Sequence, residues 1–133
     1  MLDDAVKELS NYRLHKARDC LLISEIARNE GLFRDSLNRS YYCIFHSMRA
    51  VLALDNFDSK KHSGIIDAFR KRYIKTGKFP AYFSKVIGNA FKMRNDSDYE
   101  DFYVVLSEDV IEQLEDAKLF LEAVTKYIGG LSE

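Results

Sequence analysis

The stretch SEDVIEQLEDAKLFLEAVTKYIGG, residues 107–130, carries the clearest structural pattern in the chain. Its apolar side chains recur at intervals of three and four residues, which places them along one face of an α-helix. These side chains are Val110, Leu114, Ala117, Leu121, Val124 and Ile128. Ser107 is a suitable N-cap, and Glu108 and Asp109 suit the positive end of the helix dipole. We therefore expect a helix that begins at Ser107 and ends at Gly129-Gly130.

The same periodicity predicts four further helices, separated by short breaks. They cover about residues 3–29, 33–54 and 63–75, and a segment that begins near Pro80 and ends before an irregular stretch at 101–106. Asp3 suits the start of the first helix, and Gly31 suits its end. Ser63 is expected to cap the third helix, which Thr76-Gly77 stops.

Each of the longer segments has an apolar face that should contact a common core. The first helix has Leu14, Ala17, Cys20, Leu21, Ile23 and Ala27, the second has Leu37, Tyr41, Ile44, Met48 and Val51, and the fourth has Phe83, Ile87, Ala90 and Phe91. No segment alternates between apolar and polar residues as a half-buried strand would.

The composition is that of one globular helical domain covering residues 1–133. Of these residues 47% are hydrophobic, and there are only one proline and six glycines to interrupt helices. Short connections between long helices favour antiparallel neighbours. The predicted fold class is therefore all-α, an up-and-down antiparallel bundle of four long helices and one shorter helix.

The sequence favours a cytoplasmic protein. It has no apolar run of about 18 residues that could span a membrane, and it opens with neither the basic start nor the apolar stretch of a signal peptide. Cys20 and Cys43 fall inside predicted helices, where we interpret them as buried, reduced thiols. The spacing of cysteines and histidines does not indicate a metal site, and no cofactor is expected.

Charge is distributed unevenly although the net charge is only −1. Residues 60–94 carry ten basic side chains and one acidic one, Asp67, whereas residues 95–133 carry two basic and eleven acidic side chains. Tyr73, Phe79 and Tyr82 lie within the basic block. Such a block can follow a phosphate backbone and stack on bases. Alternatively, it can complement the acidic last helix within the bundle or across a dimer.

Arg94 occupies the position after Ala90 on the apolar face of the fourth helix. A charged side chain on such a face needs a partner or a cleft. Asp98 lies one turn further on and can pair with it, although an acid after the base is the weaker order on a helix. The alternatives are a ligand or a carboxylate on another chain.

Several short motifs resemble those of the HEPN family of small α-helical domains. The segment RNDSDY at 94–99 resembles the family's signature, and SYYCIFHSMRAVL at 40–52 resembles its second helix. KHSG at 61–64 and KTG at 75–77 match the ends of the third helix. The resemblance spans roughly residues 5–128.

The resemblance implies a homodimer that acts on or beside RNA or nucleotides. It also implies a component of a toxin–antitoxin or defence pair whose partner is a nucleotidyltransferase. Many HEPN ribonucleases carry an Arg followed, four to six residues later, by a His. Arg94 matches that Arg, but Tyr99 stands where the His would be, and a tyrosine is a poor base at neutral pH. Ribonuclease activity is therefore left open, and the missing His favours a non-catalytic module that holds a nucleotide or the partner transferase through Arg94 and the basic block. A further alternative is a non-catalytic protein-interaction or structural dimer with no role in nucleic-acid binding.

His62 opens the third helix within a basic segment and is a candidate for the missing acid–base group. It can instead be an exposed residue near the helix cap. His46 shares a helix face with Tyr42 and Arg49, either lining a cleft or making an ordinary helix–helix contact, and His15 is expected at the surface. The candidate catalytic residues are Arg94, Asp98, Tyr99 and His62, and the candidate phosphate-binding residues are Lys60, Lys61, Arg70, Arg72, Lys75 and Lys92.

Overall fold

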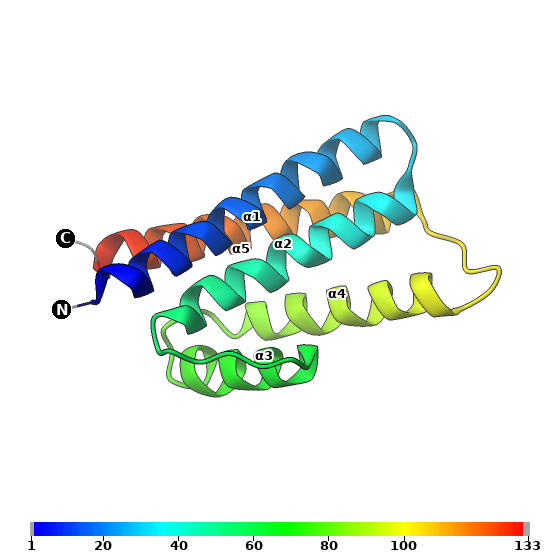
Figure 1. Ribbon diagram of the computed structural model, residues 1–133. Coiled ribbons are helices and arrows are strands. Elements are labelled where there is room, and N and C mark those ends of the chain that lie inside the picture. Colours follow the sequence, from blue (N-terminus) through cyan, green and yellow to red (C-terminus); the bar gives the residue numbers. More distant parts are fainter. Residues whose placement is uncertain (1, 132–133) are drawn as a thin grey trace.

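The computed structural model describes residues 2–131 as helices joined by short connections (Figure 1). The elements are α1 (Asp4–Asn29), α2 (Phe33–Ala53), α3 (His62–Phe69), the π-helical turn η1 (Arg70–Ile74), α4 (Tyr82–Tyr99) and α5 (Ser107–Leu131). This described part of the chain contains no strand. The predicted all-α fold class is confirmed.

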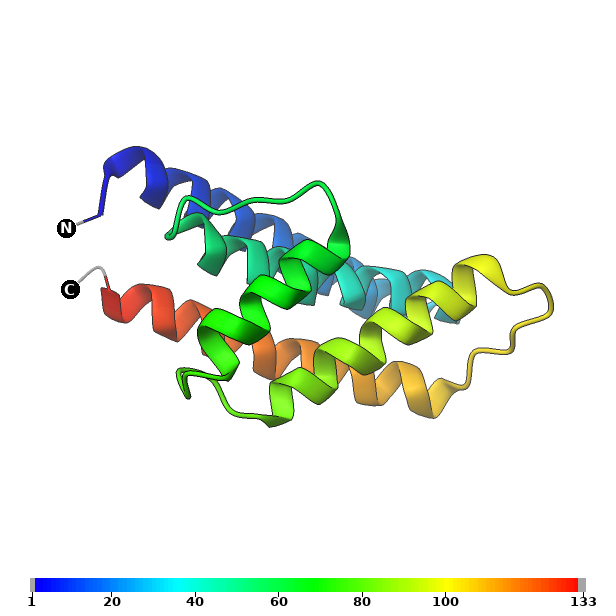
Figure 2. The ribbon, with the colours of Figure 1, turned by 90° about the horizontal axis from the view of Figure 1, so that it is seen from below.

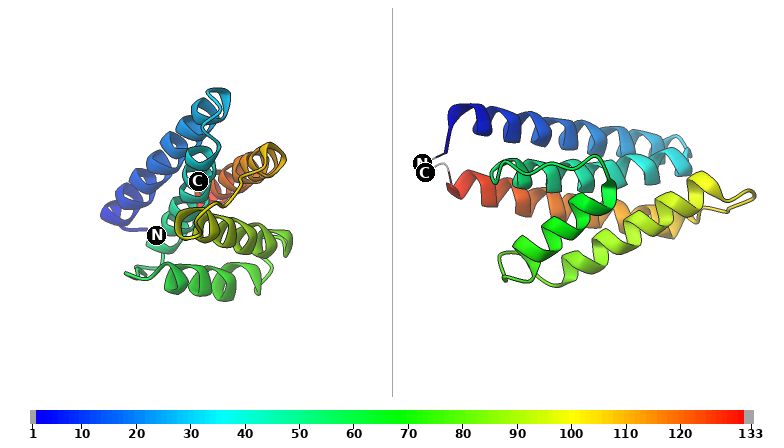
Figure 3. Two further views of the ribbon diagram at one scale, coloured as in Figure 1. Left: turned by 90° about the vertical axis from the view of Figure 1, so that its right-hand side faces the viewer. Right: turned by 60° about the horizontal axis from the view of Figure 1, so that its bottom comes forward.

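The helices run up and down, as predicted. Helix α1 is antiparallel to α2 and α5, and α4 runs antiparallel to α5 (Figures 1 and 2). Helix α3 is short and crosses the bundle on the side of α2 away from α1, as both views of Figure 3 show. The connection between α4 and α5 projects beyond one end of the bundle, and the start of α1 and the end of α5 lie at the other end (Figure 1). None of the helices within residues 2–131 is both long and apolar enough to cross a membrane.

The apolar faces predicted for α2 and α5 are confirmed, because every residue assigned to them is buried. On α1 one assignment is wrong. Ile23 is 47% exposed, and Ser24 beside it is fully buried against α2. The Ser24 hydroxyl donates to the Ser36 carbonyl at 2.7 Å, and the Ser36 hydroxyl donates back to the Ser24 carbonyl at 2.8 Å. Small residues with satisfied hydroxyls let the two backbones approach closely, and a bulky isoleucine does not fit there.

Ser24→Leu is expected to lower the free energy of unfolding by about 1–3 kcal/mol through overpacking between α1 and α2. Loss of the paired hydroxyl would add to this cost. The matched control is Ile23→Leu one position away, which should change stability by less than about 0.5 kcal/mol because the side chain faces solvent. Urea unfolding followed by circular dichroism measures both. Equal losses for the two variants would contradict this assignment of the buried face.

A cluster of aromatic rings attaches α3 and η1 to the rest of the bundle. Phe69 of α3 lies with its ring centroid 5.6 Å from that of Phe120 of α5, and Phe120 in turn lies 4.8 Å from Phe83 of α4. Tyr73 and Phe79 extend the cluster towards Tyr127 of α5. These contacts fix the helix that begins with His62.

The helix ends agree with the prediction at most places and differ at two. The Asp3 carboxylate accepts a hydrogen bond from the Ala5 amide at 3.0 Å, and Gly31 and Gly77 have φ values of 77° and 80° that suit glycine. The capping prediction for Ser63 is wrong: Lys61 is the N-cap and makes no side-chain cap bond, because the backbone of Ser63 is already helical. The predicted end at Gly129-Gly130 is also wrong, since α5 continues to Leu131. Glycine lowers helix stability by only about 1 kcal/mol, so it permits an established helix to continue.

The two thiols agree with the sequence interpretation. Cys20 and Cys43 are both buried and free, and Cys43 lies with its sulfur 4.0 Å from the Ala117 carbonyl oxygen of α5. Burial raises the pKa of the Cys43 thiol to about 12. The thiol therefore stays protonated and packs as a small apolar group between α2 and α5.

Candidate functional site

Arg94 finds its partners inside the bundle. Its Nε donates to Asp98 Oδ2 at 3.1 Å, one turn along α4, and its side chain is only 17% exposed. The guanidinium carbon lies 5.4 Å from the ring centroid of Tyr41 and 5.5 Å from that of Tyr42, both on α2. The predicted pairing with Asp98 is confirmed, and the two rings supply a cation–π contact that makes a cation acceptable at this position.

His62 lies against the same rings. Its Nδ1 is 2.6 Å from the Tyr41 hydroxyl, and its ring stacks on Phe45 with centroids 4.1 Å apart. The imidazole centroid is 5.8 Å from that of Tyr41 and 5.9 Å from that of Tyr42. It is therefore a half-buried residue of an aromatic cluster and not an exposed residue near a helix cap. The fold brings His62 and Arg94, which are far apart in the sequence, to the same pair of tyrosines.

The surroundings keep His62 neutral. Burial lowers its pKa below the ordinary value, and the positive charges of Arg94 and Arg49 lower it further. Burial raises the pKa of Tyr41 well above its ordinary value, so the phenol keeps its proton. When Nδ1 of His62 carries the proton and donates it to the Tyr41 hydroxyl oxygen, Nε2 of the neutral imidazole is left free to accept a proton.

Tyr99 does not join this cluster. It is the last residue of α4, and its side chain is 76% exposed. The residue after Asp98 lies about 100° further round the helix, so it points away from the tyrosines when Arg94 and Asp98 face them. Of the four candidate catalytic residues, Arg94 and His62 thus lie against Tyr41 and Tyr42, and Asp98 is paired with Arg94.

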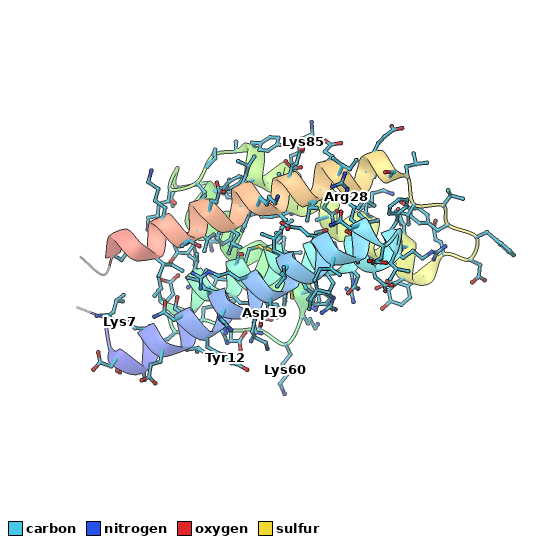
Figure 4. All side chains as sticks on the ribbon, turned by 90° about the horizontal axis from the view of Figure 1, so that it is seen from above. Lys7, Tyr12, Asp19, Arg28, Lys60 and Lys85 are labelled. Carbon is cyan, nitrogen blue, oxygen red and sulfur yellow. The ribbon has the colours of Figure 1, made fainter. Side chains whose placement is uncertain are left out.

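The basic block of residues 60–94 is divided over the molecule. Lys60, in the connection before α3, points to the same edge of the molecule as Tyr12 of α1 (Figure 4). Lys85 of α4 points to the opposite edge. Lys60 and Lys61 are exposed and directly precede His62, and Lys75 is exposed beyond η1. Within residues 2–131 no ion pair joins this block to α5. The acidic helix therefore does not neutralise the block through direct pairs in this chain.

Three other members of the candidate phosphate-binding set have partners of their own. Arg70 donates to the Ser84 carbonyl at 2.9 Å and ties η1 to α4. Arg72 lies 3.5 Å from Asp55, and its guanidinium carbon is 4.6 Å from the Phe57 ring centroid. Lys92 pairs with Asp96 at 2.7 Å. Lys92 precedes Arg94 by two residues, which puts it about 200° away around α4 and off the cluster.

The outward face of α2 was only partly recognised from the sequence. Arg39, Tyr42, His46 and Arg49 follow one another at intervals of three, four and three residues, which is one helix face. All four are half-buried. The Arg39 guanidinium carbon lies 5.2 Å from the Tyr42 ring centroid. The periodicity was the available signal, although a polar stripe at this spacing also occurs on helices with no binding role.

His46 lies among cations on this face. Burial, with the charges of Lys16, Arg49, Arg39 and Arg13, lowers its pKa to about 4. Its Nδ1 is buried, with no hydrogen-bond partner among residues 2–131. Its ring contacts are with Tyr42 and Phe45 of its own helix. His15, in contrast, has a side chain that is 73% exposed, as expected.

The low pKa of His46 predicts that the protein loses stability as the pH falls from about 6.5 towards 4. In this window the unfolded imidazole takes up a proton and the folded one does not, so protons favour unfolding. The His46→Gln variant should lack this component, worth about 1–2 kcal/mol because solvent screens a half-buried ring. Urea unfolding at several pH values measures it. A stability curve for His46→Gln that runs parallel to that of the wild type over this pH range would contradict the prediction.

The chain matches the HEPN domain family over residues 10–127. It belongs to the HEPN family. A UPF0332 protein of Thermotoga maritima is 29% identical over 125 residues, which cover 94% of this chain and 95% of that protein. Two proteins of Methanocaldococcus jannaschii that bear the name "Putative toxin" are also similar. One is 29% identical, covering 86% of this chain and 78% of its own, and the other is 26% identical, covering 95% and 93%.

Family membership confirms the resemblance found in the sequence. The matched residues include the whole of this HEPN chain's tyrosine cluster, from Tyr41 and Tyr42 through His62 to Arg94 and Asp98. The helical bundle agrees with the fold expected from that resemblance.

Proposed function

We propose that this HEPN domain binds RNA and cleaves it without a metal ion, as the toxic component of a toxin–antitoxin pair. The observation that carries the proposal is the convergence of Arg94 and His62 on Tyr41, whose ring contacts the guanidinium and whose hydroxyl contacts the imidazole. One group suits the binding of a phosphate, and the other suits proton transfer.

Arg94 is suited to hold the scissile phosphate. Metal-independent cleavage of RNA places extra negative charge on the phosphoryl oxygens when the ribose 2′-oxygen attacks phosphorus, and a fixed cation stabilises that charge. A guanidinium can form two parallel hydrogen bonds with a phosphate. Nε of Arg94 donates to Asp98, and within residues 2–131 the two terminal nitrogens have no hydrogen bond, so they are suited to a ligand.

His62 is suited to transfer the proton. Attack on phosphorus requires that a base remove the proton from the ribose 2′-hydroxyl. Departure of the 5′-oxygen then requires that a proton be donated to that oxygen. With a lowered pKa, His62 is neutral at pH 7 and can accept a proton. This role would replace that of the motif histidine, whose place in the sequence is taken by the exposed Tyr99.

A second candidate function is a non-catalytic module that holds RNA or a nucleotide. The pairing of Arg94 with Asp98 supports it, because a carboxylate beside the cation weakens its attraction for a phosphate. This alternative predicts binding that depends on salt and on Arg94, with no cleavage of the bound RNA.

We also propose that the protein forms a homodimer and pairs with a nucleotidyltransferase antitoxin. The names of the relatives support a toxin, and a toxin is held in check by a partner. Large exposed apolar side chains on α1, Leu22 and Ile26, support a further protein contact. Light scattering of the purified protein tests the dimer, and co-expression with a neighbouring nucleotidyltransferase gene tests relief of growth arrest.

The test of cleavage uses purified protein and a labelled single-stranded RNA, with and without EDTA. We expect cleavage that survives EDTA and is lost in the His62→Gln variant, while binding is retained. Binding without cleavage by the wild type would favour the non-catalytic module. Absence of both binding and cleavage at low salt would contradict the proposal in either form.

Tyr41→Phe is expected to reduce cleavage about tenfold, because His62 loses the hydroxyl that orients it while Arg94 keeps the ring beneath it. The variant is a test of positioning, so the pH profile of cleavage is measured together with the rate. The part of the rate–pH profile that reports the titration of His62 should move along the pH axis in the variant. An unchanged profile with a lower rate would mean that Tyr41 acts only through packing.

A further inference from the structure

We propose that Lys16 and Arg39 form a second phosphate subsite on the outward face of α2, so that the domain takes a single RNA strand across Tyr42. This inference rests on the proposed function and extends it from one phosphate at Arg94 to a strand of at least two phosphates. It specifies the substrate class as an oligonucleotide rather than a mononucleotide.

Tyr42 lies between the two positions. The guanidinium carbon of Arg39 is 5.2 Å from its ring centroid, and that of Arg94 is 5.5 Å from the same centroid. The two cations come from different helices, and each contacts the ring of Tyr42. Bases stack on aromatic rings and on guanidinium planes, so a strand that crosses Tyr42 can place one phosphate near each cation.

The cations of the second position lack acidic partners. Arg39 donates to its neighbour Asn38, from Nε at 3.1 Å and from Nη2 at 2.6 Å, and its side chain also hydrogen-bonds with the Cys20 thiol. Lys16 lies 5.4 Å from the Tyr12 ring centroid. Within residues 2–131 neither cation has a carboxylate oxygen inside 4.0 Å. By contrast, Arg13 and Arg49 share Asp58. Unneutralised cations beside an aromatic ring favour a polyanion.

The lowered pKa of His46 indicates that the positive charges of Lys16 and Arg39 both act on the same side chain. Lys16 of α1 and Arg39 of α2 both lower its pKa, so both lie close enough to affect the same imidazole. A histidine held neutral by surrounding cations reports a local positive potential that a bound phosphate would cancel. Within residues 2–131 neither Asp19 of α1 nor Asp35 of α2 forms an ion pair with Lys16 or Arg39, although the charge of Asp19 acts together with these two cations on Cys20.

The test compares ligands of increasing length that the protein cannot cleave. Adenosine monophosphate and 2′-O-methyl single-stranded oligonucleotides of two, four and eight residues are titrated by fluorescence anisotropy at several salt concentrations. The Lys16→Gln/Arg39→Gln double variant should bind the octanucleotide at least about tenfold more weakly, with a salt slope reduced by about 1–2. Its affinity for the mononucleotide should stay within about twofold of the wild type.

The control is the Lys85→Gln/Lys126→Gln double variant, which removes the same charge from exposed residues of α4 and α5. Its affinity for the octanucleotide should be within about twofold of the wild type, because these lysines lie outside the surface proposed to bind the RNA strand. A second readout is the NMR titration of His46, whose pKa should rise from about 4 when the octanucleotide is bound and remain there with the mononucleotide.

The outcomes separate this inference from the proposed function. If Arg94→Gln weakens octanucleotide binding and the Lys16/Arg39 double variant does not, the second subsite is overturned and the proposed function stands. Equal weakening of mononucleotide and octanucleotide binding by the double variant would also overturn it, because both ligands would then share one site. If neither variant weakens binding, both the subsite and the proposed function fail.

Discussion

Replacing Arg94 with lysine is expected to reduce RNA cleavage by about 10²–10³-fold, although the positive charge remains. The reason is geometric. Arg94 lies over Tyr41 and Tyr42 with Nε bonded to Asp98, which aims the rest of the guanidinium in one direction. A lysine ammonium is a single point of charge that stacks less well on aromatic rings and cannot form two parallel bonds with a phosphate. Single-turnover cleavage of a labelled RNA measures the rate.

The control for Arg94→Lys is Lys85→Gln, an exposed position on the same helix at the edge of the molecule opposite Lys60. It should leave the cleavage rate within about twofold of the wild type. Asp98→Asn provides the complementary test, because it keeps a hydrogen-bond acceptor beside Arg94 and removes the competing charge. If Arg94→Lys cleaved RNA as fast as the wild type, the proposed pair of parallel hydrogen bonds from the guanidinium to the phosphate would be wrong. Only the positive charge at this position would then matter.

The bundle was predictable because its apolar residues repeat over long stretches. The six residues of the α5 face from Val110 to Ile128 are all buried, as are the five of the α2 face from Leu37 to Val51. One misplaced residue does not change such a pattern, since many positions determine one helix face. Ile23 shows where the argument fails. Hydrophobicity alone favours isoleucine for a buried position, but the close approach of α1 and α2 favours the smaller Ser24.

The candidate site was predictable only in part. The pairing of Arg94 with Asp98 follows from their spacing on one helix, and their positions in the sequence are enough to predict it. The contact between His62 and Tyr41 depends on how α3 crosses α2, which no local pattern specifies. The π-helical turn η1 continues α3 over Arg70–Ile74, in a segment where a regular helix was expected over 63–75. Arg39 was missed because its importance arises from Tyr42 and Arg94 across the helix interface.

Phe120→Ala is expected to lower the free energy of unfolding by about 3–5 kcal/mol, the largest effect on stability among the variants considered. Phe120 is fully buried, and its ring contacts Phe69 of α3 and Phe83 of α4. Truncation removes the transfer free energy of the ring and leaves a cavity between three helices. Urea unfolding followed by circular dichroism measures the loss, and Leu119→Ala, at a neighbouring position that is 53% exposed, should cost less than about 0.5 kcal/mol.

The same variant links the core to the candidate site. Phe69, which Phe120 supports, lies on the short helix that begins with His62, so loosening this contact should disturb His62 more than Arg94. We therefore expect Phe120→Ala, assayed well below its unfolding temperature, to lose cleavage rate while keeping most of its affinity for RNA. If binding and cleavage fall together, the two groups depend equally on this cluster. If neither changes in the folded variant, the position of His62 is fixed by its contacts with Tyr41 and Phe45 alone.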